Sequence, residues 1–220
     1  MYVTRCRLTL HENVFYATRE IGRLYETGRY LHNYALAYAL GLAVAPYFNA
    51  TAVPRYAEDL TALNEQQVYV TPARPIAVTF DLNTFKYADN RYRVKMELSS
   101  RNTPSFGRAK ELAVGSRFEF ALVSEIPHQL PRWIRLGKWM SKAAVDVVSQ
   151  ESVDRIFSGE YISAMPLNPF DVQGVLLTYD LISMPPVSLL DQVRLVGEYF
   201  RLTDGSCMPV GLSYRFPIPN

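Results

Sequence analysis

The chain has 220 residues, of which 49% are hydrophobic, and this is enough for one large domain with a packed core and excludes a disordered chain. Its formal net charge is only +2 at pH 7, which excludes a uniformly basic nucleic-acid binder of the histone type; any attraction for nucleic acid must come from local clusters. Two cysteines near opposite ends, Cys6 and Cys207, form no paired motif and favour a reduced, cytoplasmic protein.

The N-terminal residues Tyr2–Leu10 alternate between apolar and polar side chains, so that Cys6 and Leu8 share one face. A period of two predicts a strand, here with a partly basic outer face. Because the chain begins directly with this strand, we expect no signal peptide. Residues 18–29 then mix arginine with glutamate and favour a solvated helix of mixed charge.

Residues 33–54 carry no charge, and their number is marginally sufficient to span a membrane. Asn33, Asn49 and Thr51 interrupt the apolar run, and Pro46 would break a helix. We therefore expect no membrane span. The pattern predicts a buried core helix over residues 33–45, apolar on nearly all sides and covered by the rest of the protein.

Residues 67–97 change to short strand-like runs separated by prolines and by a turn signal at residues 88–90, which predicts an inserted or protruding hairpin. Aromatic and cationic residues alternate around that turn: Tyr87, Arg91, Tyr92, Arg93 and Lys95. This pattern suits stacking on bases and pairing with phosphates, and it equally suits a solvated strand with ordinary cross-strand pairs. We expect residues 99–110 to form a loop with a second basic cluster: Arg101, Arg108 and Lys110.

Residues 117–125 alternate cleanly and predict another strand. The next segment, residues 130–146, holds both tryptophans of the chain and has no carboxylate before Asp146. Spacings of three and four residues predict a helix there, with Trp133, Leu136 and Met140 on an apolar stripe. The opposite face of that helix would carry the cations Arg132, Arg135, Lys138 and Lys142.

Gly137 lies inside this basic segment, where it costs a helix about 1 kcal/mol relative to alanine and marks a turn that could bring the backbone close to a ligand. Trp139 would then be a stacking platform, whereas Trp133 falls on the apolar stripe and is expected in the core. Two interpretations stay open: a phosphate-binding surface, or an amphipathic surface helix whose basic face is only solvated.

The last part of the chain predicts strands. Val175–Ile182 is an apolar run rich in β-formers, and residues 198–202 can pair with residues 206–216 across a turn at Asp204 and Gly205. Pro209 would confine the last strand to an edge or cut it short. No repeat or linker divides the chain, so we expect a single domain over residues 1–220 with an insertion at about 67–110.

This order of elements suggests an α+β fold in which helices cover one face of an antiparallel sheet. A ferredoxin-like or RRM-like core with an inserted β-hairpin is one solution. The usual aromatic signature of RRM proteins is absent, because Gly197, Tyr199 and Phe200 only approach it. We therefore do not expect RNA to stack on the sheet face in the standard RRM manner.

The three histidines, His11, His32 and His128, have no partner at the spacing of a metal site, and we expect neither a metal nor another cofactor. The sequence also shows no nucleophile elbow, no Walker-type glycine loop and no paired aspartates of a two-metal nuclease. A metal-independent ribonuclease needs only a base, a positioning group and cations. His11 or His128, with Lys138 or Tyr16, could supply these.

Two stretches of the sequence resemble one protein family. The N-terminus of Csc-one proteins is similar to residues 13–27, NVFYATREIGRLYET, and to residues 30–36, YLHNYAL. The later basic motif of the same family is similar to residues 135–143, RLGKWMSKA. Csc-one is the Cas-five-type subunit of type I-D CRISPR effector (Cascade) complexes, within the RAMP superfamily of RRM-like proteins. The resemblance extends along the length of the chain.

The resemblance implies a non-catalytic subunit that caps the 5′ handle of the crRNA in an antiviral ribonucleoprotein complex. The implied partners are the crRNA, the Cas-ten-like large subunit and the Csc-two (Cas-seven-type) backbone subunit, with target DNA reached through the complex. A thumb-like hairpin between residues 67 and 108 would contact RNA near the handle. One feature departs from many RAMP proteins: in place of a glycine-rich loop near the C-terminus, this chain has only Gly205 and Gly211 with Pro209 between them.

Proteins hold irregular single-stranded RNA with cations on phosphates and rings on unstacked bases. With the resemblance, we expect phosphate contacts from Arg132, Arg135, Lys138 and Lys142. Trp139 would stack or anchor the loop, with further contacts from Arg101, Arg108, Arg19 and Arg23. Two alternatives remain, a metal-independent endoribonuclease that processes precursor crRNA, and a protein-only adaptor whose basic cluster meets acidic protein surfaces.

Overall fold

The structure is a computed structural model, and it describes residues 1–45, 54–86 and 106–216. Those residues form fourteen strands and two helices, and the strands belong to three sheets. Strands therefore dominate the described part of the fold.

The first sheet has six strands, five of them in the spatial order β4-β8-β1-β10-β9, and β5 pairs with β8. All neighbouring strands are antiparallel. Their bounds are β1 Tyr2–Leu10, β4 Val68–Val70, β5 Arg74–Ala77, β8 Arg117–Ser124, β9 Trp133–Leu136 and β10 Ser141–Ser152. The strands predicted at Tyr2–Leu10 and residues 117–125 are thus confirmed, and they lie side by side.

Alternation along β1 and β8 accounts for the core under this sheet. Cys6 and Leu8 of β1, and Phe118 and Phe120 of β8, are buried in one cluster with Leu36 from a helix. Burial of an aliphatic or phenylalanine side chain stabilises a fold by about 1.5–3 kcal/mol. The inner face of the β1–β8 pair therefore holds much of the N-terminal half together.

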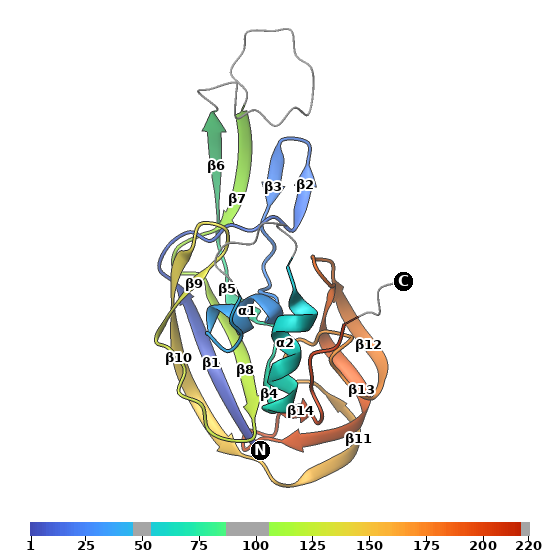
Figure 1. Cartoon of the computed structure of the whole chain (residues 1–220). Coiled ribbons are helices and arrows are strands. Elements are labelled where there is room, and N and C mark those ends of the chain that lie inside the picture. Colours follow the sequence, from blue (N-terminus) through green and yellow to red (C-terminus); the bar gives the residue numbers. More distant parts are fainter. Residues whose placement is uncertain (46–53, 87–105, 217–220) are drawn as a thin grey trace.

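Two helices, α1 (Asn33–Ala39) and α2 (Tyr56–Glu65), lie between the six-stranded sheet and the C-terminal strands (Figure 1). His32 caps α1, because its Nδ1 accepts a hydrogen bond from the backbone N–H of Tyr34 at 3.2 Å. Side-chain caps of this kind satisfy a backbone donor that the helix itself leaves unpaired.

The expected buried helix exists, but its predicted extent over residues 33–45 is wrong. The helix ends at Ala39, before a turn in which Gly41 has φ +74°, a conformation that glycine adopts without the steric cost of a Cβ. Within the described ranges, no helix is long and apolar enough to cross a membrane.

The C-terminal sheet has the order β11-β13-β12, with β14 paired to β13. Its strands are β11 Ile156–Ile162, β12 Val175–Ile182, β13 Leu189–Arg201 and β14 Cys207–Pro209. The predicted strand Val175–Ile182 is confirmed. The terminal hairpin also forms, with Phe200 opposite Met208, and its second strand ends at Pro209 as expected for a residue without an N–H donor.

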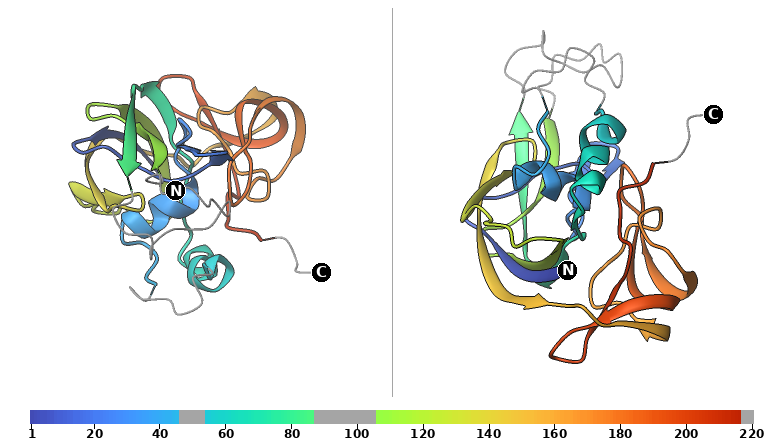
Figure 2. Two further views of the ribbon diagram at one scale, coloured as in Figure 1. Left: turned by 90° about the horizontal axis from the view of Figure 1, so that it is seen from above. Right: turned by 60° about the horizontal axis from the view of Figure 1, so that its bottom comes forward.

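A third sheet has the order β2-β3-β7-β6, and β3 and β7 are parallel. Its strands are β2 Arg19–Ile21, β3 Leu24–Glu26, β6 Phe80–Lys86 and β7 Phe106–Leu112. In Figures 1 and 2, β6 and β7 project from one end of the molecule, with β2 and β3 beside them in Figure 1.

This third sheet corrects two predictions. The helix favoured over residues 18–29 is wrong: β2 and β3 form a short hairpin around Gly22, whose φ is +59°. The loop expected over residues 99–110 is wrong from residue 106, where β7 begins, because pairing with β6 and β3 orders the chain. The predicted stacking residues 87–95 and Arg101 lie outside the described residues.

The expected α+β class holds in part: antiparallel sheets and two packed helices are present, but the described chain is mostly β-structure. The helix expected over residues 130–146 is replaced by β9 and β10, which lowers the helical content further. The ferredoxin-like arrangement, the thumb and the single-domain boundary remain predictions.

A buried carboxyl group ties the C-terminal segment to α1 and β4. Asp171 is fully buried and accepts hydrogen bonds from the side chains of Asn33 (2.9 Å) and Tyr69 (3.0 Å) and from the backbone N–H of Arg215 (2.9 Å). Burial raises the pKa of Asp171 to about 6, although these donors act in the opposite direction. The group is thus a satisfied but titratable link between three segments of the chain.

Candidate nucleic-acid interface

The basic segment 130–146 forms a β-hairpin and not a helix. Ile134 and Leu136 are buried, whereas Trp133 and Arg135 are exposed, so the burial alternates with a period of two. The predicted amphipathic helix is therefore wrong. The physical reason is that β10 pairs with β1 on one side and β9 on the other, and these tertiary contacts override a weak local preference.

The turn of this hairpin contains two left-handed residues, Gly137 with φ +71° and Met140 with φ +54°. The backbone N–H of Lys138 donates to the carbonyl oxygen of Phe15 at 2.8 Å. A Cβ on Gly137 would lie only 2.6 Å from that same oxygen. The predicted turn at Gly137 is confirmed, and the group its backbone approaches is the Phe15 carbonyl.

Four cations come from this segment, and we call them the hairpin cation cluster: Arg132, Arg135, Lys138 and Lys142. The Arg135 guanidinium pairs with Glu12 at 3.3 Å, and the Glu12 carboxylate also accepts the backbone N–H of Lys142 at 2.6 Å. Among the described residues, no carboxylate pairs with the side chains of the other three cations. The cluster therefore keeps an excess of positive charge at the surface.

Trp133 lies at the surface of this cluster and not in the core, so that prediction is wrong. Its side chain is 48% exposed, because β9 directs it to the opposite side from Ile134. The Nζ of Lys142 lies 3.9 Å from the centre of its ring, and the ring of His11 meets it edge-on at 4.9 Å. The ring thus holds one cation of the cluster by a cation–π contact.

Trp139 is also about half exposed, at 47%, but its ring has protein partners. It packs against Phe15, in the segment after β1, and against Phe85 at the outer end of β6. Trp139 therefore anchors the turn, one of the two roles predicted for it, and brings the hairpin cation cluster next to the projecting third sheet.

The other predicted contacts divide between the third sheet and the part of the chain that the structure leaves undescribed. Arg19, Arg23 and Arg108 are all exposed. Arg19 is on β2, Arg23 lies in the turn between β2 and β3, and Arg108 is on β7. The backbone N–H of Arg108 donates to the carbonyl of Arg23 at 2.8 Å, so these two distant residues are neighbours. Lys110, in contrast, pairs with Glu26 at 3.3 Å.

Sequence reasoning missed three residues of this surface. Glu12 and Phe15 lie beside or inside the family-like motif at residues 13–27, which was the available signal. Phe85 had no local signal, because its contact with Trp139 depends on how β6 projects from the sheet. All three act by positioning the hairpin.

Of the candidate ribonuclease residues, His11 lies at the exposed hairpin, and His128 is half-buried in the segment between β8 and β9. The third histidine, His32, is buried as the cap of α1, and burial lowers its pKa to about 4. Tyr16 donates its hydroxyl to the carbonyl of Gly28 at 2.9 Å, and burial raises its pKa well above the ordinary value. Within the described ranges, no three His, Cys, Asp or Glu side chains gather in a way that could hold a metal ion.

Comparison with known proteins gives one family. The model of a family described as type I-D CRISPR-associated protein Cas5/Csc1 matches residues 1–217. No curated protein is a significant match. Similar solved structures include a chain from a cryo-EM structure of the type III-B Cmr-beta bound to cognate target RNA and AMPPnP, state 1. That chain is 10% identical, with 88% of this chain and 86% of that chain covered and a TM-score of 0.44.

Proposed function

The chain belongs to the type I-D CRISPR-associated Cas5/Csc1 family, and from this premise we propose that it is a non-catalytic, crRNA-binding subunit of a type I-D CRISPR interference complex. In this role it caps the 5′ handle of the crRNA. It also bridges the Cas-ten-like large subunit and the Csc-two backbone subunits in antiviral defence, and target DNA is reached through the complex.

The hairpin cation cluster is the observation that carries this proposal. Three of its four cations have no carboxylate partner among the described residues, and the segment holds no carboxylate between Glu125 and Asp146. A surface of this kind attracts phosphates over a distance of about 8–10 Å at physiological salt. Single-stranded RNA supplies one phosphate per nucleotide, so a flexible handle can follow the cluster.

The third sheet supports a second contact beside the first. Arg23 and Arg108 are neighbours there, and the contact of Phe85 with Trp139 joins this sheet to the basic hairpin. In the proposal, RNA that leaves the hairpin cation cluster passes along the arginines of β2, β3 and β7. Arg101 remains a proposed contact outside the described residues.

The test is RNA binding across a salt series, with a handle-bearing oligonucleotide and fluorescence anisotropy. The variant Arg135→Ala/Lys138→Ala/Lys142→Ala should bind more weakly. The slope of log binding constant against log salt concentration should become shallower by about 0.7 for each phosphate that the variant no longer neutralises. A control that also removes three cations, Arg155→Ala/Arg194→Ala/Arg201→Ala on the C-terminal sheet and directly before β11, should keep the wild-type slope. If a folded hairpin variant binds like the wild type, this RNA site is wrong.

Cleavage of precursor crRNA is the second candidate, because one observation favours it. His11 and Lys142 meet the same exposed ring of Trp133, which places a base and a cation together on the basic hairpin. The assay is incubation of the purified protein with a repeat hairpin in a chelator, beside His11→Ala. Our proposal predicts no cutting by either protein, and cutting that is abolished in His11→Ala would replace it.

A further inference from the structure

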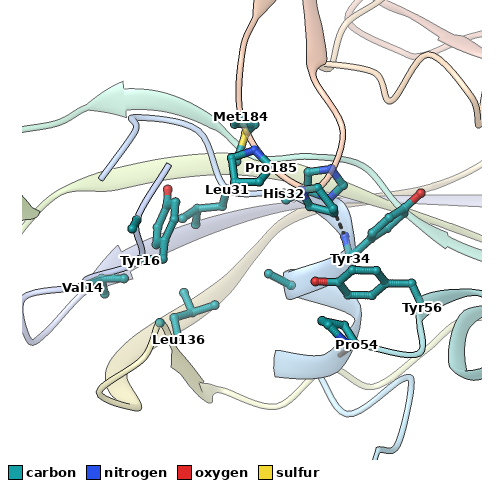
Figure 3. A pocket seen from close by; sticks show the side chains of 14 residues that line it. Val14, Tyr16, Leu31, His32, Tyr34, Pro54, Tyr56, Leu136, Met184 and Pro185 are labelled. Atoms are coloured by element: carbon teal, nitrogen blue, oxygen red, sulfur yellow. Dashed lines mark hydrogen bonds between the residues drawn. The ribbon is translucent and has the colours of Figure 1, made fainter. Parts of the chain in front are cut away.

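A cavity of about 350 Å³ opens beneath the turn of the basic hairpin. Figure 3 shows Tyr16 and Leu136 on one side of it and Tyr34 and Tyr56 on the other, with Met184 and Pro185 of the chain between β12 and β13 at the edge. Gly137 also lines it, so the cavity lies next to the hairpin cation cluster without containing any of its members.

The described residues that line this cavity carry no charge. None of them is Asp, Glu, Lys or Arg, and burial keeps His32 neutral at pH 7 by lowering its pKa to about 4, although the Val187 backbone acts in the opposite sense. A phosphate inside would find no cation to replace its water. The cavity therefore suits an uncharged, largely apolar group.

The walls are held in place before any ligand arrives. The ring centroid of Tyr34 lies 4.5 Å from that of His32 and 5.0 Å from that of Tyr56. Tyr16 is fixed by its hydrogen bond to the carbonyl of Gly28. Such rings offer flat apolar contact at a small entropic cost. His32 adds no accessible donor to the cavity, because its Nδ1 accepts from the backbone N–H of Tyr34 and its Nε2 is buried beside the Val187 backbone.

One side of the mouth, formed by α1 and the residues after it, is uncharged as well, whereas the cations Lys138 and Arg55 each follow a lining residue, Gly137 and Pro54. Residues 33–45 contain no charged side chain, and their exposed members are Ala35, Gly41, Val44 and Ala45. Val44 is 84% exposed, and Ala35 lines the cavity from the outer side of α1. An apolar cavity set in such a surface matches the core of a protein interface, where charged residues are depleted and aromatic anchors are enriched.

We propose that this cavity is a socket for one aromatic side chain of a protein partner, which packs against the apolar and aromatic lining. The neutral lining and the uncharged surface of residues 33–45 beside it favour a protein side chain over a nucleotide. A nucleobase is the competing occupant, because Lys138 follows Gly137 at the edge of the cavity.

The first test uses the isolated full chain with ¹³C-methyl-labelled methionine and follows the NMR signal of Met184. N-acetyl-tryptophanamide should shift this signal with a dissociation constant in the millimolar range or below, as expected for a fragment of this size. Ala35→Trp, which fills the mouth, should weaken that binding roughly tenfold or more, whereas Ala62→Trp on the exposed side of α2 should not. A stronger response to adenosine monophosphate, or no response to either probe, would overturn the proposal.

The second test uses the assembled effector complex and therefore rests on the proposed function. A photo-crosslinking p-benzoylphenylalanine at Ala35 should join the chain to another protein, at a yield well above that of the same group at Ala62. Crosslinks to RNA, or a yield no higher than at Ala62, would contradict the socket. Because RNA binding by Ala35→Trp should keep the wild-type affinity and salt slope, failure of the socket and failure of the RNA site are distinguishable.

Discussion

The indole ring of Trp139 stacks on the ring of Phe15, with ring centroids 4.9 Å apart and ring planes inclined by 28°. Phe85 meets the same indole edge-on at 5.7 Å. These contacts join the turn of the basic hairpin to the segment after β1 and to the outer end of β6. A base that stacks on Trp139 must therefore share the indole with Phe15.

Trp139→Ala should lower the stability of the protein as well as its affinity for RNA. Each aromatic pair contributes about 0.5–1.5 kcal/mol beyond the buried area, and the substitution removes two such pairs. We expect the free energy of unfolding to fall by about 2 kcal/mol in urea denaturation, with most of it kept in Trp139→Phe. A decrease in RNA affinity at unchanged stability would show instead that Trp139 is a free stacking platform.

Gly137→Ala should be far more damaging than the same change at another left-handed glycine. A Cβ at Gly137 would lie 2.6 Å from the Phe15 carbonyl oxygen, whereas a Cβ at Gly115, with φ +81°, meets nothing within 4 Å. We expect Gly115→Ala to cost about 1 kcal/mol and Gly137→Ala about 3 kcal/mol or more, measured by thermal or urea unfolding. Equal costs at the two positions would mean that the turn can move away from Phe15.

Glu12→Gln should strengthen RNA binding. Among the residues that the structure describes, Glu12 is the carboxylate that pairs with the hairpin cation cluster, and glutamine can still accept the backbone N–H of Lys142. An exposed ion pair contributes about 0–1 kcal/mol, so we expect little change in stability but a gain of up to about fivefold in RNA affinity at low salt. Glu65→Gln at the end of α2 is the control, and a weaker Glu12→Gln complex would contradict the prediction.

His32 should make the protein less stable as the pH falls. Its pKa is about 4 in the folded state and about 6.5 when unfolded, so the unfolded chain binds the extra proton between these values. The free energy of unfolding thus decreases from pH 6.5 to pH 4, by up to about 3 kcal/mol. His32→Asn, which keeps a capping oxygen, should remove this decrease, as measured by urea unfolding at several pH values. If the variant keeps the wild-type pH profile, the pKa of His32 is not lowered by folding.

Asp171 should act in the opposite direction. Its pKa is raised to about 6 from an ordinary value of 3.8, so the folded state binds the extra proton between pH 3.8 and 6. This group therefore destabilises the fold as the pH rises through that window, by up to about 3 kcal/mol. In urea unfolding at several pH values, Asp171→Asn should lose stability more steeply on acidification than the wild type. The gain in stability from protonation of Asp171 is then missing and no longer offsets the loss caused by His32. A shallower fall would mean that Asp171 is ionised well below pH 6.

The sequence by itself determined the features that depend on neighbours along the chain. Period-two alternation identified the strands at Tyr2–Leu10 and residues 117–125, because each side of a strand meets one environment, and an apolar run rich in β-formers identified Val175–Ile182. The turn at Gly137 and the short last strand at Pro209 followed from the backbone limits of glycine and proline. The concentration of basic and aromatic residues in segment 130–146 was equally visible.

Only the tertiary structure decided how these parts meet. Segment 130–146 fits helical spacing, but the pairing of β10 with β1 makes it a hairpin, which exposes Trp133 and places Lys142 over its ring. Arg23 and Arg108 become neighbours through the parallel pairing of β3 with β7, which no local pattern encodes. Pairing between distant strands supplies hydrogen bonds and burial that outweigh a weak local preference, so the layout of the surface was settled by contacts far apart in sequence.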